Sequence, residues 1–234
     1  MKIFKKLSTI ILSLSIMTSS VSAFAYSDCD SDAVITLTEL NVLSGYDDGT
    51  FKPAALLTRA EFAKMISLVN GGPEVDGSPV APPVENPFSD VSINHWAYSY
   101  ILHCNALGLI DGYEDGSFKP NENVSLAESI KICLSAIGYN NLITENSENW
   151  YEPWIDLAYE YGLLETKYVD PYRATNRVTA AILVKRTIKL PIYHVTGYDF
   201  STGKPVIQFD FADGTVDENG KTKPYSTLLT THFQ

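Results

Sequence analysis

Cysteine is scarce in this chain of 234 residues, which has only Cys29, Cys104 and Cys133. Three is an odd number and too few for a small protein stapled by disulfides, so that class is excluded. Cys104 and Cys133 fall on the apolar faces of two helical patterns, which predicts two buried thiols in preference to a bridge. No His or Cys pair has the spacing of metal ligands, and we expect neither a metal nor a cofactor.

Long apolar runs are missing after the N-terminus, so no later stretch predicts a membrane span. Residues 1–25 combine three lysines, a mostly apolar run over Leu7–Met17 and the small-residue cleavage sequence Ala23–Ala25. This pattern is typical of a secretory signal peptide that is removed before the mature protein folds. An uncleaved membrane anchor is the alternative interpretation of the same segment.

Positive charge is also in short supply. The chain has 17 Lys and Arg against 28 Asp and Glu, a net charge of −11. Cleavage of the signal peptide removes three lysines and no acid, which leaves the mature chain at −14. Such a chain binds nucleic acid and anionic membranes poorly, so we expect neither as a partner. An anionic ligand would have to be held by a few local cationic side chains.

Catalytic patterns are lacking as well. His95 and His103 have no nucleophile pattern near them, and the acidic residues are explained by turns and helix caps. Glycan hydrolysis commonly needs two positioned carboxylates, and no motif supplies them, so we expect no enzyme. Asp47, Asp48 and Asp115 resemble fragments of a calcium loop but lack its full ligand series and terminal Glu, which favours turn formation.

The chain does contain a sharp internal repeat. Gly45–Pro53 (GYDDGTFKP) and Gly112–Pro120 (GYEDGSFKP) agree at seven of nine positions. Both copies favour a turn, because an Asp-Gly pair tolerates backbone angles that other residues avoid. Each copy leads into a Ser/Thr-x-x-Glu capping box, Thr58–Glu61 or Ser125–Glu128, which predicts a helix start. Self-similarity of this kind predicts a repeat architecture.

Apolar residues at helical spacing on both sides of the loop divide the chain into helix–loop–helix repeats. The predicted segments are a first repeat at 27–71, a Pro/Gly-rich linker at 72–87, a second repeat at 88–141 and a degenerate third repeat at 149–190. A constant offset of 54 aligns the third repeat with the second. In that alignment Thr179 caps the last helix and Ala180 follows it.

The C-terminal residues 191–234 differ in kind from the repeats. Val206–Phe211 has strand-like composition, and the Asp-Gly and Asn-Gly pairs that follow are turn signals. We expect a short β-hairpin in which Leu228–Phe233 is the partner strand. An isolated hairpin is marginal alone, so it should dock on the helices or stay mobile.

Together, the motifs resemble the S-layer homology (SLH) domain family over about residues 27–189. The resemblance rests on Phe88-x-Asp90, Trp96, the loop Gly112–Pro120 and Thr58-Arg59-Ala60-Glu61. It implies a mainly α fold, with three helix–loop–helix repeats in a pseudo-threefold helical bundle. It also implies an exported protein held at the S-layer or cell wall of a Gram-positive-type bacterium. The implied partner is a secondary cell wall polysaccharide, often capped by a pyruvylated sugar.

The resemblance and elementary chemistry together nominate a ligand set. Arg59 at a helix start can pair with a pyruvate carboxylate, and Trp96 offers a flat apolar face to a sugar ring. Lys52 and Lys119 add point charges, and Asp90 lies in the adjoining region. The alternatives are a solvated Arg59 and, for Trp96 and Trp150, a place in the core or in the wall of a groove.

Departures from the family pattern restrict this prediction. The counterpart of Arg59 in the second repeat is Leu126, and the offset of 54 then gives Ala180 in the third; neither can pair with a carboxylate. The first repeat lacks the opening Phe-x-Asp. We therefore expect at most one competent groove, joining Arg59 to the Asp90–Trp96 region. The competing interpretation is a structural protein with weak or no glycan binding, whose residues 191–234 contact another surface protein.

Overall fold

The computed structural model describes residues 26–72, 86–143, 147–199 and 204–209, together with Leu228 and His232. The predicted signal peptide and most of the predicted linker lie outside the described residues. The helices are α1 (Asp32–Glu39), α2 (Arg59–Val69), α3 (Tyr98–Ala106), α4 (Leu126–Ala136), the 3-10 helix η1 (Tyr139–Leu142), α5 (Glu152–Glu160) and α6 (Arg177–Thr187). The strands are β1 (Tyr193–Asp199) and β2 (Lys204–Phe209). The prediction of a mainly α fold is confirmed.

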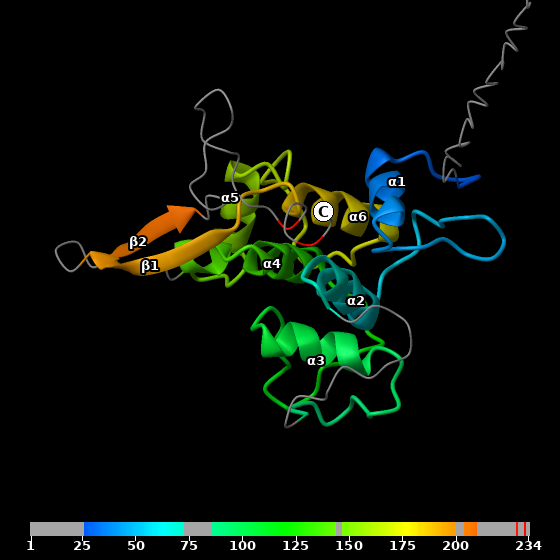
Figure 1. Ribbon diagram of the computed structural model, residues 1–234, viewed down its shortest axis with the longest axis horizontal. Helices are drawn as coiled ribbons and strands as arrows, with labels where there is room; N and C mark the ends of the chain where they lie inside the picture. Colours follow the sequence, from blue (N-terminus) through cyan, green and yellow to red (C-terminus); the bar gives the residue numbers. More distant parts are fainter. Residues whose placement is uncertain are drawn as a thin grey trace, which may run out of the picture.

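The six α-helices form three helix–loop–helix repeats arranged in a ring (Figure 1). The second helix of each repeat packs against the first helix of the next: α2 on α3, α4 on α5, and α6 on α1. The three second helices also contact one another in every pairing. The contacts close on themselves after three steps, as the predicted pseudo-threefold bundle requires.

A ring of backbone hydrogen bonds repeats the same symmetry at the centre. The Leu57 N–H donates to the Thr175 carbonyl (2.9 Å), Val124 to Leu57 (3.0 Å) and Thr175 to Val124 (2.8 Å). Each donor lies just before the second helix of its repeat. Main-chain groups therefore hold the three helix starts together, whatever side chains the repeats carry.

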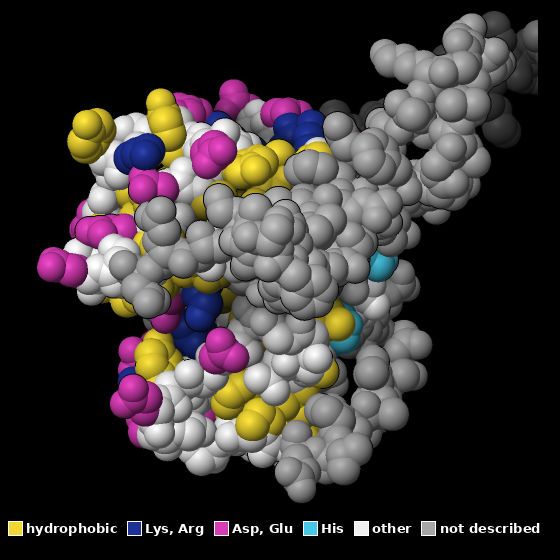
Figure 2. Space-filling model, turned by 90° about the vertical axis from the view of Figure 1, so that its left-hand side faces the viewer, with side chains coloured by type: hydrophobic (Ala, Val, Ile, Leu, Met, Phe, Trp, Pro, Cys, Tyr) yellow, Lys and Arg dark blue, Asp and Glu magenta, His cyan; other side chains and the backbone are white. Residues whose placement is uncertain are grey.

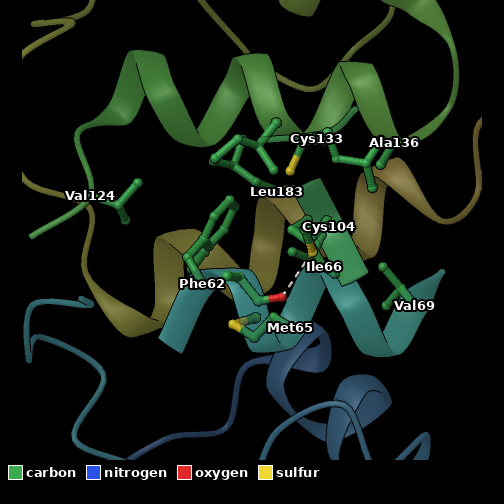
Figure 3. Close-up of a cluster of buried hydrophobic side chains, with 14 of the residues drawn as sticks. Phe62, Met65, Ile66, Val69, Cys104, Val124, Cys133, Ala136 and Leu183 are labelled. Atoms are coloured by element: carbon green, nitrogen blue, oxygen red, sulfur yellow. Dashed lines mark hydrogen bonds between the residues drawn. The ribbon is translucent and has the colours of Figure 1, made fainter. Parts of the chain in front are cut away.

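The hydrophobic core lies between the second helices (Figure 3). Side chains from α2, α3, α4 and α6 meet there, among them Phe62, Ile66, Cys104, Cys133 and Leu183. The Cys104 thiol donates to the carbonyl of Ala63 across the α2–α3 contact, at 3.3 Å. Both thiols are buried and free, so the prediction of two buried thiols is confirmed. These residues recur every three or four positions, which places them on one face of each helix.

Helix starts follow the capping prediction in two repeats and correct it in the third. Thr58 and Ser125 form complete capping boxes with the Glu three residues on. In α6, however, Asn176 is the cap, because its side chain accepts the Thr179 N–H at 2.9 Å. The predicted cap at Thr179 is wrong. The third loop is three residues shorter than an offset of 54 assumes, so Arg177, not Ala180, begins the helix.

The opening of the first repeat also differs from the prediction. Tyr26 packs on Phe51 with ring centroids 5.4 Å apart, as Phe88 packs on Phe118 at 5.2 Å. Asp28 accepts the backbone N–H groups of Phe51 and Lys52 at 2.7 and 2.9 Å. A Tyr-x-Asp opening thus does in the first repeat what Phe-x-Asp does in the second.

Beyond the helices, β1 and β2 form an antiparallel hairpin (Figure 1). Its first pair is Tyr193 with Phe209, and a register shift lies between Val195 and Gly197. The hairpin was predicted, but its partner strand was wrong: β2 pairs with 193–199, and the chain is helical at Leu228 and His232. The segment 193–199 lacks simple alternation because Thr196 and Gly197 interrupt it. Within the described residues, every helix is too short or too polar to span a membrane.

Candidate functional site

Arg59 begins α2, and its side chain crosses from the first repeat into the second. Nε donates to the Phe118 carbonyl at 2.8 Å, and Nη1 donates to Glu128 Oε1 at 2.7 Å. The guanidinium carbon also lies 4.8 Å from the ring centroid of Tyr113 and 4.7 Å from that of Phe118. Only 7% of Arg59 is exposed. This arginine therefore links the first repeat to the second, and it also lines a pocket.

Arg177 repeats this arrangement between the third repeat and the first. It begins α6, and it donates from Nε to the Phe51 carbonyl and from Nη2 to the Ser44 carbonyl, both at 2.8 Å. Its guanidinium carbon lies 5.0 Å from the Tyr46 ring centroid. In the part of the chain that the structure describes, Arg177 forms no ion pair, whereas Arg59 pairs with Glu128. Sequence reasoning missed Arg177 because of the incorrect offset.

The Arg59 pocket is a cavity of about 180 Å³ where the second and third repeats meet. The polar and aromatic residues that line it are Arg59, Asp111, Tyr113, Glu128, Lys131 and Trp150. The Nζ atom of Lys131 lies 3.6 Å from Asp111 Oδ2. The indole of Trp150 is 46% exposed. A buried, hydrogen-bonded arginine, a partly exposed lysine and an exposed aromatic face therefore converge on one hollow.

The Arg177 pocket has the same construction between the first and second repeats, with a volume of about 240 Å³. Its corresponding lining residues are Arg177, Ser44, Tyr46, Glu61, Lys64 and Trp96. Lys64 and Lys131 were not among the predicted site residues. The signal was available: each lysine follows a capping Glu by three residues, which places both on one helix face.

Positively and negatively charged side chains both line the two pockets. On the face shown in Figure 2, Lys and Arg side chains gather in a hollow bordered by hydrophobic and acidic side chains. Tyr113 OH donates to Glu128 Oε1 at 3.1 Å. Burial raises the pKa of Tyr113, against an opposing effect of Arg59, so the phenol stays a proton donor at neutral pH.

The structure separates the residues that were predicted to share one groove. Trp96 lines the Arg177 pocket, while Arg59 lines the pocket of Trp150. The predicted grouping of Arg59 with the Asp90–Trp96 region is therefore wrong, although the binding role of each residue stays a prediction. The reason is the arrangement of the repeats in a ring. Each pocket is lined by the loop of one repeat and by the tryptophan of the next repeat.

Asp90 and the two loop lysines take local partners. Asp90 accepts the N–H groups of Phe118 and Lys119 at 2.7 and 2.8 Å, and so fixes the second loop. The Nζ atom of Lys119 lies 4.1 Å from the Tyr113 ring centroid, and Lys52 lies 4.0 Å from that of Tyr46. These lysines therefore flank the pocket tyrosines without lining the cavities themselves.

The helix N-termini are not open anion sites. The Arg59 N–H donates to the Glu122 carbonyl at 2.8 Å, and the Ala60 N–H donates to the Pro120 carbonyl at 3.0 Å. The loop of the next repeat thus uses the backbone donors that the sequence argument left for a ligand. Any anion held here must be bound by side chains.

The interface between the third and first repeats has diverged. Leu126 begins α4 where the other repeats have arginine, and it is fully buried. Between α6 and the start of α1, a cavity is lined by Lys185, Arg186 and Lys189. Two of these cations already have partners, because Lys185 pairs with Asp32 and Arg186 pairs with Glu165. No aromatic side chain lines this cavity in the described residues.

Comparison with known proteins identifies the repeats. Residues 27–63 and 87–128 match the S-layer homology domain family. These two segments are S-layer homology repeats. The third helix–loop–helix unit lies outside the matched segments, yet it supplies Trp150 to one pocket and Arg177 to the other.

Among the described residues, no three His, Cys, Asp or Glu side chains are grouped so that they could hold a metal ion.

Three similar proteins match different shares of the chain. A cell surface glycoprotein 1 of Acetivibrio thermocellus is 36% identical over 109 residues, which are 45% of this chain and 5% of that protein. A cell surface protein of Thermoanaerobacter kivui is 25% identical over 217 residues, or 88% of this chain and 27% of that protein. A cellulosome-anchoring protein of A. thermocellus is 37% identical over 102 residues, 43% of this chain and 22% of that protein. The chain thus spans about a quarter or less of the length of these relatives.

Proposed function

We propose that this chain is a non-enzymatic module that anchors to the cell wall by binding a pyruvylated sugar of a secondary cell wall polysaccharide. The observation that carries the proposal is the duplicated pocket, in which an arginine, a lysine and an exposed tryptophan meet at two of the three repeat interfaces. The surface and anchoring relatives support the same role. The location that follows is the outer surface of a Gram-positive-type bacterium.

The chemistry of each pocket suits a sugar that carries a carboxylate. The tryptophan offers an apolar face to the ring, and the lysine offers a positive charge to the carboxylate. Both cavities are smaller than the roughly 300 to 1,000 Å³ of pockets for drug-sized ligands, which favours one terminal sugar. Because the mature chain has a net charge of −14, an acidic ligand needs local cations of this kind.

The two pockets should differ in strength. In the Arg59 pocket, Glu128 pairs with the arginine and Asp111 lies 3.6 Å from Lys131, so both cations already have an acidic partner. In the Arg177 pocket neither Arg177 nor Lys64 forms an ion pair in the described residues, although Glu61 lines the same cavity. We therefore propose that the Arg177 pocket binds the carboxylate more tightly. This reverses the order expected from sequence, in which Arg59 alone was competent.

Sedimentation of the protein with native and depyruvylated cell walls tests the function. We expect binding to native walls and loss of binding when the pyruvate is removed. Isothermal titration with the released polysaccharide then compares Lys64→Ala and Lys131→Ala with Lys189→Ala, which changes an exposed lysine outside both pockets. Each pocket variant should bind several-fold more weakly, and the control should bind normally. Absence of wall binding by the intact protein would reject the proposal.

One observation favours a second role for the C-terminal region. The β1–β2 hairpin has no third strand in the described residues, so each strand has an outer edge available for pairing. A surface protein that adds a strand at this edge would be carried to the wall by the repeats. Deletion of β2 (204–209), which keeps the buried Tyr193 and Leu228, should then abolish capture of that protein while wall sedimentation persists.

A further inference from the structure

The Arg59 pocket continues into an aromatic surface that its counterpart lacks. Trp150 contacts the ring of Tyr151, with centroids 6.0 Å apart, and Tyr151 contacts Tyr172 at 5.4 Å. Successive rings are nearly perpendicular, at 83° and 80°. Trp150 and Tyr172 are exposed, and Tyr172 reaches 66%. We call these three residues the aromatic platform.

The platform is specific to the third repeat. Tyr151 directly follows the pocket tryptophan, and in the Arg177 pocket the residue after Trp96 is the buried Ala97. Tyr172 follows the loop proline Pro171, where the second repeat has Asn121 after Pro120. The ring contact that Trp96 does have is with the preceding His95. The two pockets thus share their inner residues and differ in what lies outside them.

Tyr172 is held in place even though it is exposed. Its backbone N–H donates to Asp170 Oδ1 at 3.0 Å, and its ring packs against Tyr151, which is itself partly buried on the core. Tyrosine supplies a large rigid contact area for little conformational entropy. Exposed apolar surface of this kind, continuous with a binding pocket, usually marks an interaction site. The platform presents no Lys or Arg among its rings, which suits an uncharged ligand.

We propose that the aromatic platform is a second glycan subsite, which binds the neutral sugar units adjoining the charged terminal sugar in the Arg59 pocket. The inference rests on the proposed function of that pocket. Trp150 belongs to both sites, so a glycan bound in the pocket leaves it over the platform. Contact with the exposed ring of Tyr172, which Tyr151 holds in place, then adds affinity for longer glycans. The Arg177 pocket, without a platform, distinguishes glycan length less.

The test uses two probes with the full mature chain: the pyruvylated terminal monosaccharide of the wall glycan as its methyl glycoside, and a wall oligosaccharide of about four units that ends in the same sugar. To isolate the Arg59 pocket, titrations are made in a Lys64→Ala, Arg177→Ala background. We expect about tenfold tighter binding of the oligosaccharide than of the monosaccharide. Tyr172→Ala should remove most of that gain and leave monosaccharide binding unchanged.

Tyr168→Ala is the matched control, because Tyr168 is 97% exposed in the same repeat and makes no ring contact in the described residues. It should change neither affinity. A Tyr172→Ala variant that binds the oligosaccharide normally overturns the platform while the pocket stands. Failure of the unsubstituted chain to bind the monosaccharide overturns pocket and platform together. Self-association that Tyr172→Ala abolishes in sedimentation equilibrium would make the platform a contact between copies and also overturn the proposal.

Discussion

Arg59 Nη1 lies 2.7 Å from Glu128 Oε1, and this ion pair joins the start of α2 to the capping carboxylate of α4. The other carboxylate oxygen of Glu128 accepts the N–H and the hydroxyl of Ser125, both at 2.8 Å. One carboxylate thus caps its own helix and binds the preceding repeat. The pair is mostly buried, so its loss should be felt in stability as well as in binding.

Arg59→Leu should lower the free energy of unfolding by about 3 kcal/mol, because it leaves the Glu128 charge without its partner. Urea denaturation followed by circular dichroism measures this. Lys167→Leu is the matched control: it breaks the Lys167–Asp156 pair, in which both side chains are exposed, and should cost about 1 kcal/mol or less. Equal losses in the two variants would contradict a structural role for Arg59.

Asn176→Ala should destabilise the protein by about 1 kcal/mol, the usual effect of removing an N-cap side chain. Thr179→Ala should change stability by no more than about 0.5 kcal/mol, because only the Thr179 backbone takes part in the cap. Thermal unfolding of both variants distinguishes the two alignments of the third repeat. A larger effect from Thr179 would restore the alignment with an offset of 54.

Stability should fall as the pH drops below about 4, the ordinary pKa range of Asp. Hydrogen bonds lower the pKa of Asp115, first from the Ser117 hydroxyl and then from its N–H, and the Phe51 N–H does the same for Asp28. A carboxyl whose pKa is lowered by folding stabilises the folded state at pH values above its ordinary pKa. This stability is lost as the pH falls through the pKa of the folded state. A plot of the unfolding midpoint against pH should therefore be flatter for Asp115→Asn than for the unsubstituted protein. Glu114→Gln is the control and should keep the original slope.

Cys29 alone should react quickly with an aromatic disulfide reagent in the native protein at pH 8. Burial raises the pKa of Cys104 far above its usual value and that of Cys133 to about 12, so neither forms the reactive thiolate. One thiol should therefore be counted in buffer and three in denaturing urea. In Cys29→Ser the fast reaction should disappear, and three fast thiols in buffer would contradict the buried core.

Much of the architecture was readable from sequence because its signals are local. Two nearly identical loops, two capping boxes and apolar stripes at helical spacing predicted the helices and their repetition. The errors lie where signals are weak or distant. A shortened loop in the third repeat displaced the alignment by three residues and concealed Arg177. The strand partner of Val206–Phe209 was misassigned, because composition does not say which segments pair.

The sequence by itself determined the helix–loop–helix units, their family resemblance and the acidic balance that leaves few cations for an acidic ligand. Only the tertiary structure decided which residues share a pocket. Each pocket takes its arginine, its lysine and its tryptophan from three different repeats, and the ring of repeats brings them together. The physical reason is that the helix starts bond to the loops of their neighbours, so contacts between repeats, not distances along the chain, set the site.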